Sequence, residues 1–166
     1  MTAATSSPSH AALSALPPQP PQPAAPPSPA ALKLGYAGLV PFVLGAALVW
    51  LVRPEVHPFV VDALSKYAAL ILSFLGGLHW ALGMGHAQRP GSAARLAWGA
   101  GVPVAAWISA LMPAYAGLVL QGVLLSVCYA VDRKVFPAHG WAAWLTLRFR
   151  LSVVAALACF VAAAGS

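Results

Sequence analysis

One histidine falls inside a long apolar stretch, where an ionisable side chain is unusual. His79 lies in the segment from Lys66 to His86, which has no charged residue between its ends when this histidine is counted as neutral. An ionisable group at membrane depth is by default a candidate for proton transfer, ligand binding or transport, because burying it in lipid is unfavourable. The alternative is a neutral imidazole that hydrogen-bonds to a neighbouring helix. The sequence leaves both interpretations of His79 open.

A glutamine occupies a similar position further along the chain. Gln121 lies near the middle of the apolar run from Ala114 to Val131. A buried amide in a membrane helix usually hydrogen-bonds to another helix, which contributes about 0.5–2 kcal/mol. Contact with a transported substrate is the alternative. Broken helices near glycine pairs often form transport sites, so Gly76–Gly77, His79 and Gln121 together mark a candidate path.

The sequence lacks the common motifs of catalysis, metal binding and haem binding. It contains no GxSxG, HExxH or P-loop motif and no paired carboxylates. His79 and His86 are about 10 Å apart along one helix, which is too far for both to ligate one haem iron. Cys128 and Cys159 lie in apolar segments outside any CxxC or Cys/His cluster, so we expect small buried side chains. We therefore expect no enzyme activity, no metal site and no cofactor.

The composition is typical of an integral membrane protein. Of the 166 residues, 60% are hydrophobic and 7% are charged, against about 25% charged in a soluble domain. The net charge is +6, but the charges fall between apolar runs. A positive-inside distribution explains this pattern better than nucleic-acid binding does, so we expect a lipid bilayer and no nucleic acid as partner.

Five apolar runs are long enough to cross a bilayer, which requires roughly 20 residues at about 1.5 Å each. The sequence predicts an all-α bundle of five transmembrane helices in residues 32–166. Residues 1–31 hold nine prolines, and this Pro/Ala-rich composition predicts a disordered tail. Pro41 and Pro103 should each kink the span that contains them. The predicted spans are about 34–52, 64–85, 96–112, 114–131 and 147–164.

Small residues repeat at every fourth position of the second and third predicted spans, which places them on one face of each helix. Such faces let helix backbones approach closely in lipid, where no hydrophobic force drives association. We expect these two spans to pair, and the remaining small face to bind a second copy or another membrane protein. The positions are Ala69, Ser73, Gly77 and Ala81, and then Ala97, Gly101, Ala105 and Ser109.

Positive charge is distributed unevenly between the two sides of the predicted bundle. Five spans place the N-terminal tail and the second and fourth connections on one side. Because cytoplasmic loops carry an excess of Lys and Arg, we expect a cytoplasmic N-terminus and a periplasmic C-terminus. The side with the N-terminal tail carries Lys33, Arg89, Arg95, Arg133, Lys134, Arg148 and Arg150. The other side carries Arg53 and Lys66.

The second span contains a motif that resembles a family of small membrane proteins. Tyr67 is followed by ILSFLGG over residues 71–77 and then by His79 and Trp80. This run is similar to the domain of unknown function 3429, although Ala81 stands where that family more often has glycine. A second patch also resembles the family, at Asp132, Trp144, Leu147 and Arg148.

The resemblance covers roughly residues 33–163 and implies a location more than an activity. Members of that family occur in bacterial and mitochondrial inner membranes and have no established function, so we expect a bacterial inner membrane. Its residues also suggest a candidate functional cluster, formed by His79, Trp80, Asp132 and Arg148 at the inner interface. Sequence spacing alone does not show that Asp132 or Arg148 reaches His79.

Two functions follow from these patterns. The first is a non-catalytic module that binds or helps assemble other membrane proteins, with a homo-oligomer or a complex as the expected state. The second is a small transporter or carrier with a site near Gly76–Gly77, His79 and Gln121.

Overall fold

The structure is a computed structural model that describes residues 24–85 and 90–166. Within these ranges every regular element is a helix. Five stretches are long and apolar enough to cross a membrane, so the prediction of an all-α, five-span protein is confirmed. Most of the predicted tail, together with His86 and Arg89, lies outside the described residues. The five stretches are Pro29–Leu51, His57–Gly85, Ser92–Leu111, Ala114–Ala138 and Ala142–Ala164.

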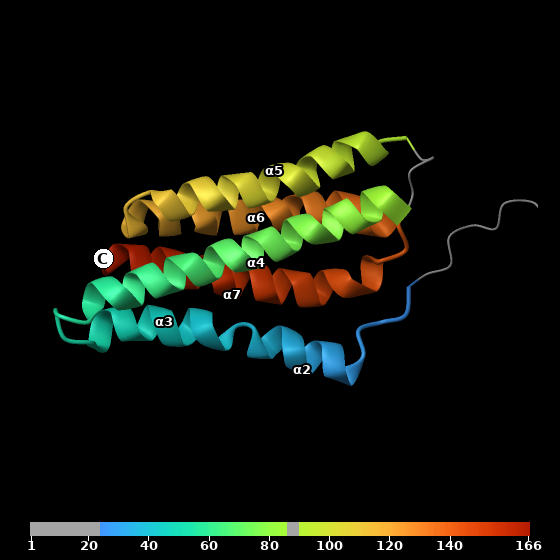
Figure 1. The fold of residues 1–166 in the computed structure, drawn as a ribbon. Helices are drawn as coiled ribbons and strands as arrows, with labels where there is room; N and C mark the ends of the chain where they lie inside the picture. The colour runs from blue at the N-terminus through green and yellow to red at the C-terminus, as the bar shows by residue number, and fades with distance from the viewer. Residues whose placement is uncertain (1–23, 86–89) are drawn as a thin grey trace, which may run out of the picture.

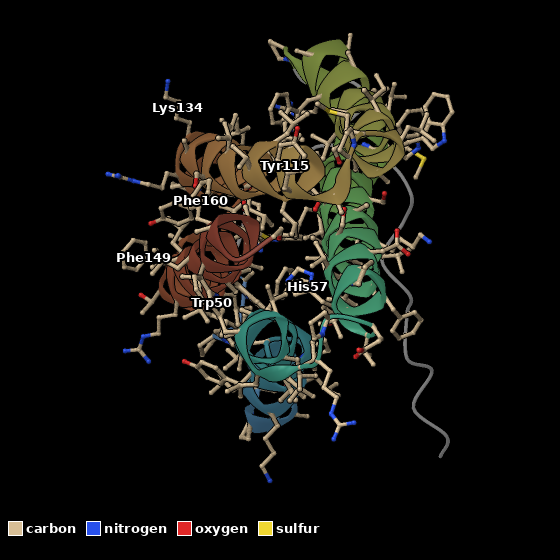
Figure 2. The ribbon with its side chains drawn as sticks, turned by 90° about the vertical axis from the view of Figure 1, so that its left-hand side faces the viewer. Trp50, His57, Tyr115, Lys134, Phe149 and Phe160 are labelled. Carbon is tan, nitrogen blue, oxygen red and sulfur yellow. The ribbon has the colours of Figure 1, made fainter. Side chains whose placement is uncertain are left out.

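The helices lie roughly along one axis (Figure 1). α4 (His57–Gly85) packs most extensively on α5 (Ser92–Leu111), and α6 (Ala114–Ala138) packs most extensively on α7 (Leu145–Ala164). α3 (Val40–Leu51) contacts both α4 and α7. The end-on view places α5 and α3 on opposite sides, with α4, α6 and α7 between them (Figure 2).

The first span is divided into two helices at the position where proline disfavours a continuous helix. α2 (Pro29–Ala37) ends three residues before α3 begins, and Pro41 occupies the first turn of α3. Proline has no N–H to donate to the carbonyl one turn back, and its ring crowds that turn. The predicted interruption at Pro41 is therefore present. α5, in contrast, remains one helix across Pro103.

The two largest differences from the predicted spans are at the start of α4 and at the end of α6. α4 begins at His57 rather than near residue 64, and its first turns include Asp62 and Lys66, which pair at 2.6 Å across one turn. α6 continues to Ala138 rather than ending near residue 131. The predicted loop of residues 132–144 was therefore wrong over its first half. The polar residues there interrupt the hydropathy of the chain without interrupting its helix.

α6 ends in a glycine-dependent turn that reverses the chain. Gly140 has a φ of 77°, a left-handed conformation that glycine adopts without a Cβ penalty. The Trp141 N–H donates to the Phe136 carbonyl at 2.9 Å, and the Gly140 N–H donates to the Pro137 carbonyl at 3.2 Å. These two hydrogen bonds form a Schellman motif. The hydrophobic contact that accompanies the motif is between Phe136 and Trp141, whose ring centroids are 5.5 Å apart. A short 3₁₀ helix, Ala142–Trp144, then leads into α7.

The opposite end of the bundle is fixed by contacts to the C-terminus of α7. The Trp50 indole N–H donates to the Val161 carbonyl at 3.2 Å, and the His57 Nε2 donates to the Gly165 carbonyl at 2.9 Å. In Figure 2 His57 faces the interior of this end, whereas Lys134 and Phe149 point away from the bundle. These contacts join α3 and α4 to α7.

The second and third spans pair as predicted, but through different residues. A Cβ on Gly76 would lie 2.7 Å from the Gly99 carbonyl oxygen and 2.6 Å from the Pro103 Cδ. A Cβ on Gly99 would lie 2.7 Å from the Trp80 backbone nitrogen. The two helix backbones therefore meet at Gly76 and Gly99, where only glycine fits without a shift.

Two residues of the predicted small-residue faces, Gly77 and Gly101, do not lie at this contact. A Cβ on Gly77 or Gly101 would meet no described atom within 4 Å. Small residues at every fourth position define one face of a helix, but they do not show which helix packs against that face. In α4, the adjacent face, which contains Gly76, buries more side chains. Of the remaining predicted positions, Ala81 and Ala97 are exposed, Ala69, Ser73 and Ala105 are partly buried, and Ser109 is buried.

Candidate functional site

Three residues of the candidate cluster meet inside the bundle. The His79 Nε2 lies 2.7 Å from the Asp132 Oδ1 and donates to it. The Arg148 Nε and Nη2 donate to the other carboxylate oxygen, Oδ2, at 2.8 and 2.6 Å. Asp132 therefore accepts hydrogen bonds from both neighbours, and a single carboxylate connects α4, α6 and α7.

All three side chains are withdrawn from solvent and lipid. His79 and Asp132 are each 2% exposed and Arg148 is 9% exposed. Removing a carboxylate and a guanidinium from water costs several kcal/mol per ion unless each finds a partner with good hydrogen-bond geometry. Here the two charges offset each other, and the imidazole satisfies the remaining carboxylate oxygen.

The cluster lies at one end of the bundle, the end that also carries the α6–α7 connection. His79 is six residues before the end of α4, Asp132 is six residues before the end of α6, and Arg148 is the fourth residue of α7. Six residues correspond to about 9 Å of helix. His79 and Asp132 are therefore more than one helical turn inside the bundle, and Asp132 is not in a surface loop as its predicted position implied.

A helical pattern in α6 could have indicated the burial of Asp132. Leu125, Cys128, Asp132 and Phe136 follow one another at spacings of three and four, and all four are buried. Such spacing places them on one helix face. Hydropathy alone predicts a loop at this acidic residue, because charged residues usually end an apolar run.

Trp80 does not join the other three residues. Its side chain is 43% exposed, and its backbone packs against Gly99 of α5. Adjacent residues on a helix point about 100° apart, so Trp80 cannot share the inward direction of His79. The structure thus separates Trp80 from the cluster, although the two residues are neighbours in sequence.

The His79 ring lies near two aromatic rings. Its neighbours are Trp98, at 6.5 Å between centroids and edge-on, and Phe136, at 6.3 Å. The His79 Nδ1 and the Trp98 Nε1 are both buried, and neither has a hydrogen-bond partner among the described residues. When the Nε2 N–H of a neutral imidazole donates to Asp132, its Nδ1 is left as an acceptor.

Gln121 belongs to a second, separate polar network. Its Nε2 donates to the Ser65 Oγ at 3.2 Å and to the Ser109 Oγ at 3.0 Å. This amide therefore joins α4, α5 and α6. The two networks meet α4 at Ser65 and His79, which are 14 residues or about 21 Å apart along the helix. Gln121 and His79 thus do not line one common site, and Gly76 between them is covered by α5.

The structure shows no ligand set for a metal in the part of the chain it describes. No three His, Cys, Asp or Glu side chains are grouped there. Cys128 and Cys159 are free and buried.

Comparison with known proteins gives the family. The profile of a family described as "Protein of unknown function (DUF3429)" matches residues 27–164. The chain belongs to the DUF3429 family. The matched region includes all five candidate spans, so the resemblance expected from the motif around His79 is confirmed. The chain is a multi-pass membrane protein of this family.

A curated relative is similar over most of this chain. Transmembrane protein 69 of Xenopus tropicalis is 37% identical over 135 residues, covering 75% of this chain and 50% of that protein. The chain thus spans about half the length of this relative. No solved structure matches the chain.

Proposed function

We propose that this chain is a non-enzymatic protein of a bacterial inner membrane that binds, or helps to assemble, other membrane proteins. The observation that carries the proposal is an exposed stripe of small residues on α4. Gly77, Ala81 and Gly85 follow each other at spacing four, and all three are exposed. A Cβ on either glycine would meet no described atom within 4 Å.

This stripe has the properties of a helix-binding face. Its three residues extend over about 12 Å of helix. Glycine within a helix is about 1 kcal/mol less favourable than alanine, so two exposed glycines weaken α4 without a packing contact to any described residue. Close approach of a second helix would supply that benefit. The contact between Gly76 and Gly99 is an example of such an approach within the same protein.

The polar groups inside the bundle support a structural role rather than a catalytic one. Gln121 bonds to two serines, and Asp132 bonds to His79 and Arg148. Each network joins three helices. A carrier site near Gly76–Gly77, His79 and Gln121 receives less support, because the two networks are separated and Gly76 is packed against α5.

The proposed orientation has the N-terminus in the cytoplasm. Exposed or half-exposed cations gather at the end of the bundle that holds the N-terminal side of α2 and the α6–α7 connection. Positive-inside distribution then places this end in the cytoplasm. The described cations at this end, apart from the buried Arg148, are Lys33, Arg95, Arg133, Lys134 and Arg150.

Native mass spectrometry of the protein extracted in a mild detergent tests the proposed function. The expected result is a stoichiometric complex, with a second copy or another membrane protein, above the chain mass of 17.0 kDa. Gly77→Leu should abolish this complex by preventing close approach, whereas Ala130→Leu, at an exposed site on α6, should leave it intact. A wild-type monomer with no bound protein, or a complex that survives Gly77→Leu, would contradict the proposal.

A further inference from the structure

The segment before α2 is held against the connection between α6 and α7. It runs from Ala24 to Ser28, and Figure 1 draws it, in blue, at the end of the bundle where α6 leads into α7. The Ala24 N–H donates to the Gly140 carbonyl at 2.9 Å, and the Trp144 indole N–H donates to the Ala25 carbonyl at 3.1 Å. Two hydrogen bonds therefore join the start of the described chain to a connection far along the sequence.

The same segment is extended, and its composition favours polyproline II. Ala25, Pro26 and Ser28 each precede a proline, which disfavours the α conformation at all three positions. Ser28 has a φ of −66° and a ψ of 159°, close to polyproline II values. A polyproline II helix makes no internal hydrogen bonds, so its carbonyls remain available to donors on a neighbouring surface. The bond from the Trp144 indole to Ala25 is a contact of this kind.

The α6–α7 connection places two indole rings beside this segment. Trp141 and Trp144 are both half-buried, and side chains three residues apart in a 3₁₀ turn lie on the same side. Both rings line a cavity of about 660 Å³ together with Ala24 and Ala25. Trp141 packs edge-on against Phe136, and its indole N–H has no hydrogen-bond partner among the described residues. A second indole donor is therefore available next to the one that Ala25 already uses.

We propose that the α6–α7 connection is a docking site for the chain's own proline-rich tail, and that residues 17–23 continue along it from Ala24. These residues read PPQPPQP, with five prolines in seven positions. Three residues of 3₁₀ helix rise about 6 Å, and two residues of polyproline II also extend about 6 Å. With Ala25 at Trp144, the Pro23 carbonyl is then the one that accepts from the Trp141 indole.

Two physical properties of the tail favour this occupant. Proline-rich segments bind aromatic-lined grooves because their extended conformation is formed before binding, so little backbone entropy is lost. The tail is also tethered at the site, since Ala25 lies three residues before the Ser28 cap of α2. Such a short link gives an effective concentration in the millimolar range, so weak contacts suffice for docking. The site does not include the small-residue stripe of α4, and the inference does not depend on the proposed function.

Photo-cross-linking of the full chain in lipid nanodiscs tests this docking, with a benzophenone amino acid in place of Gln22. An equal mixture of ¹⁵N-labelled and unlabelled chains separates adducts within one chain from adducts between chains when the products are mapped by tandem mass spectrometry. We expect an adduct within the chain, to residues 136–144. Trp141→Phe/Trp144→Phe keeps both aromatic rings but removes both indole donors, and it should lower the adduct yield about fivefold or more. Trp107→Phe, at an exposed ring of α5, is the matched control and should leave the yield unchanged.

A second variant changes the tail and leaves every described residue in place. Pro20→Gly/Pro21→Gly/Pro23→Gly should also lower the yield, because glycine removes the preformed extended backbone. Adducts to lipid or to a second chain, in place of residues 136–144, would overturn the proposal. An unchanged yield in either variant, with helical circular dichroism like that of the wild type, would overturn it as well.

Discussion

The buried ion pair between Arg148 and Asp132 should be the most sensitive polar contact of this fold. Arg148→Gln removes the counter-charge of Asp132, a carboxylate that is 2% exposed, together with two donors at 2.8 and 2.6 Å. His79 would then be the remaining partner of the carboxylate among the described residues. Breaking a buried pair on one side costs about 3–5 kcal/mol, because the other charge is left uncompensated. We expect a loss of this size in the free energy of unfolding.

Unfolding by SDS in mixed micelles, followed by circular dichroism, measures this loss. Arg150→Gln is the control, since Arg150 is exposed on the same helix and its replacement should leave the free energy of unfolding close to that of the wild type. Asp132→Asn/Arg148→Gln should be more stable than Arg148→Gln alone, because no isolated charge remains. The reasoning is refuted if Arg148→Gln costs less than about 1 kcal/mol, or if the double variant loses the sum of the two single effects.

Three further predictions use the same protein. Gly99→Ala should destabilise the protein by about 1–3 kcal/mol in the unfolding assay, since its Cβ would lie 2.7 Å from the Trp80 nitrogen, whereas Gly101→Ala should be neutral or slightly stabilising. Gln121→Leu should cost about 0.5–2 kcal/mol by removing the bonds to two serines, and an unchanged unfolding free energy would show that these bonds add nothing. Arg133→Cys should react with a membrane-impermeant maleimide in inside-out vesicles but not in intact spheroplasts, and the reverse pattern would invert the proposed orientation.

Apolar length was sufficient to predict the helices, but not where they end. The five candidate spans follow from runs of apolar residues that the bilayer thickness requires, and the interruption before Pro41 follows from the missing N–H of proline. The ends of α4 and α6 were missed because Asp62, Lys66 and Asp132 interrupt the apolar pattern. Two of these form a pair one turn apart, and the third is paired inside the bundle, so each is compatible with a helix.

The polar cluster could be predicted only in part. Asp132 and Arg148 have opposite charges and lie on either side of one connection, which makes their pairing a natural expectation. The participation of His79 depends on which face of α4 meets α6, and hydropathy cannot show this for a helix that is apolar on all sides. Trp80 follows His79 directly in the motif, yet it points out of the bundle.

The proposed function depends most directly on whether another helix contacts the exposed stripe of α4 in the membrane. Photo-cross-linking in intact cells tests this, with a benzophenone amino acid in place of Ala81 and, as the control, in place of the exposed Ala130 on α6. We predict one defined protein adduct from position 81, to a second copy or to another membrane protein, and none from position 130. No adduct at position 81, or the same adducts from both positions, would contradict the proposed function.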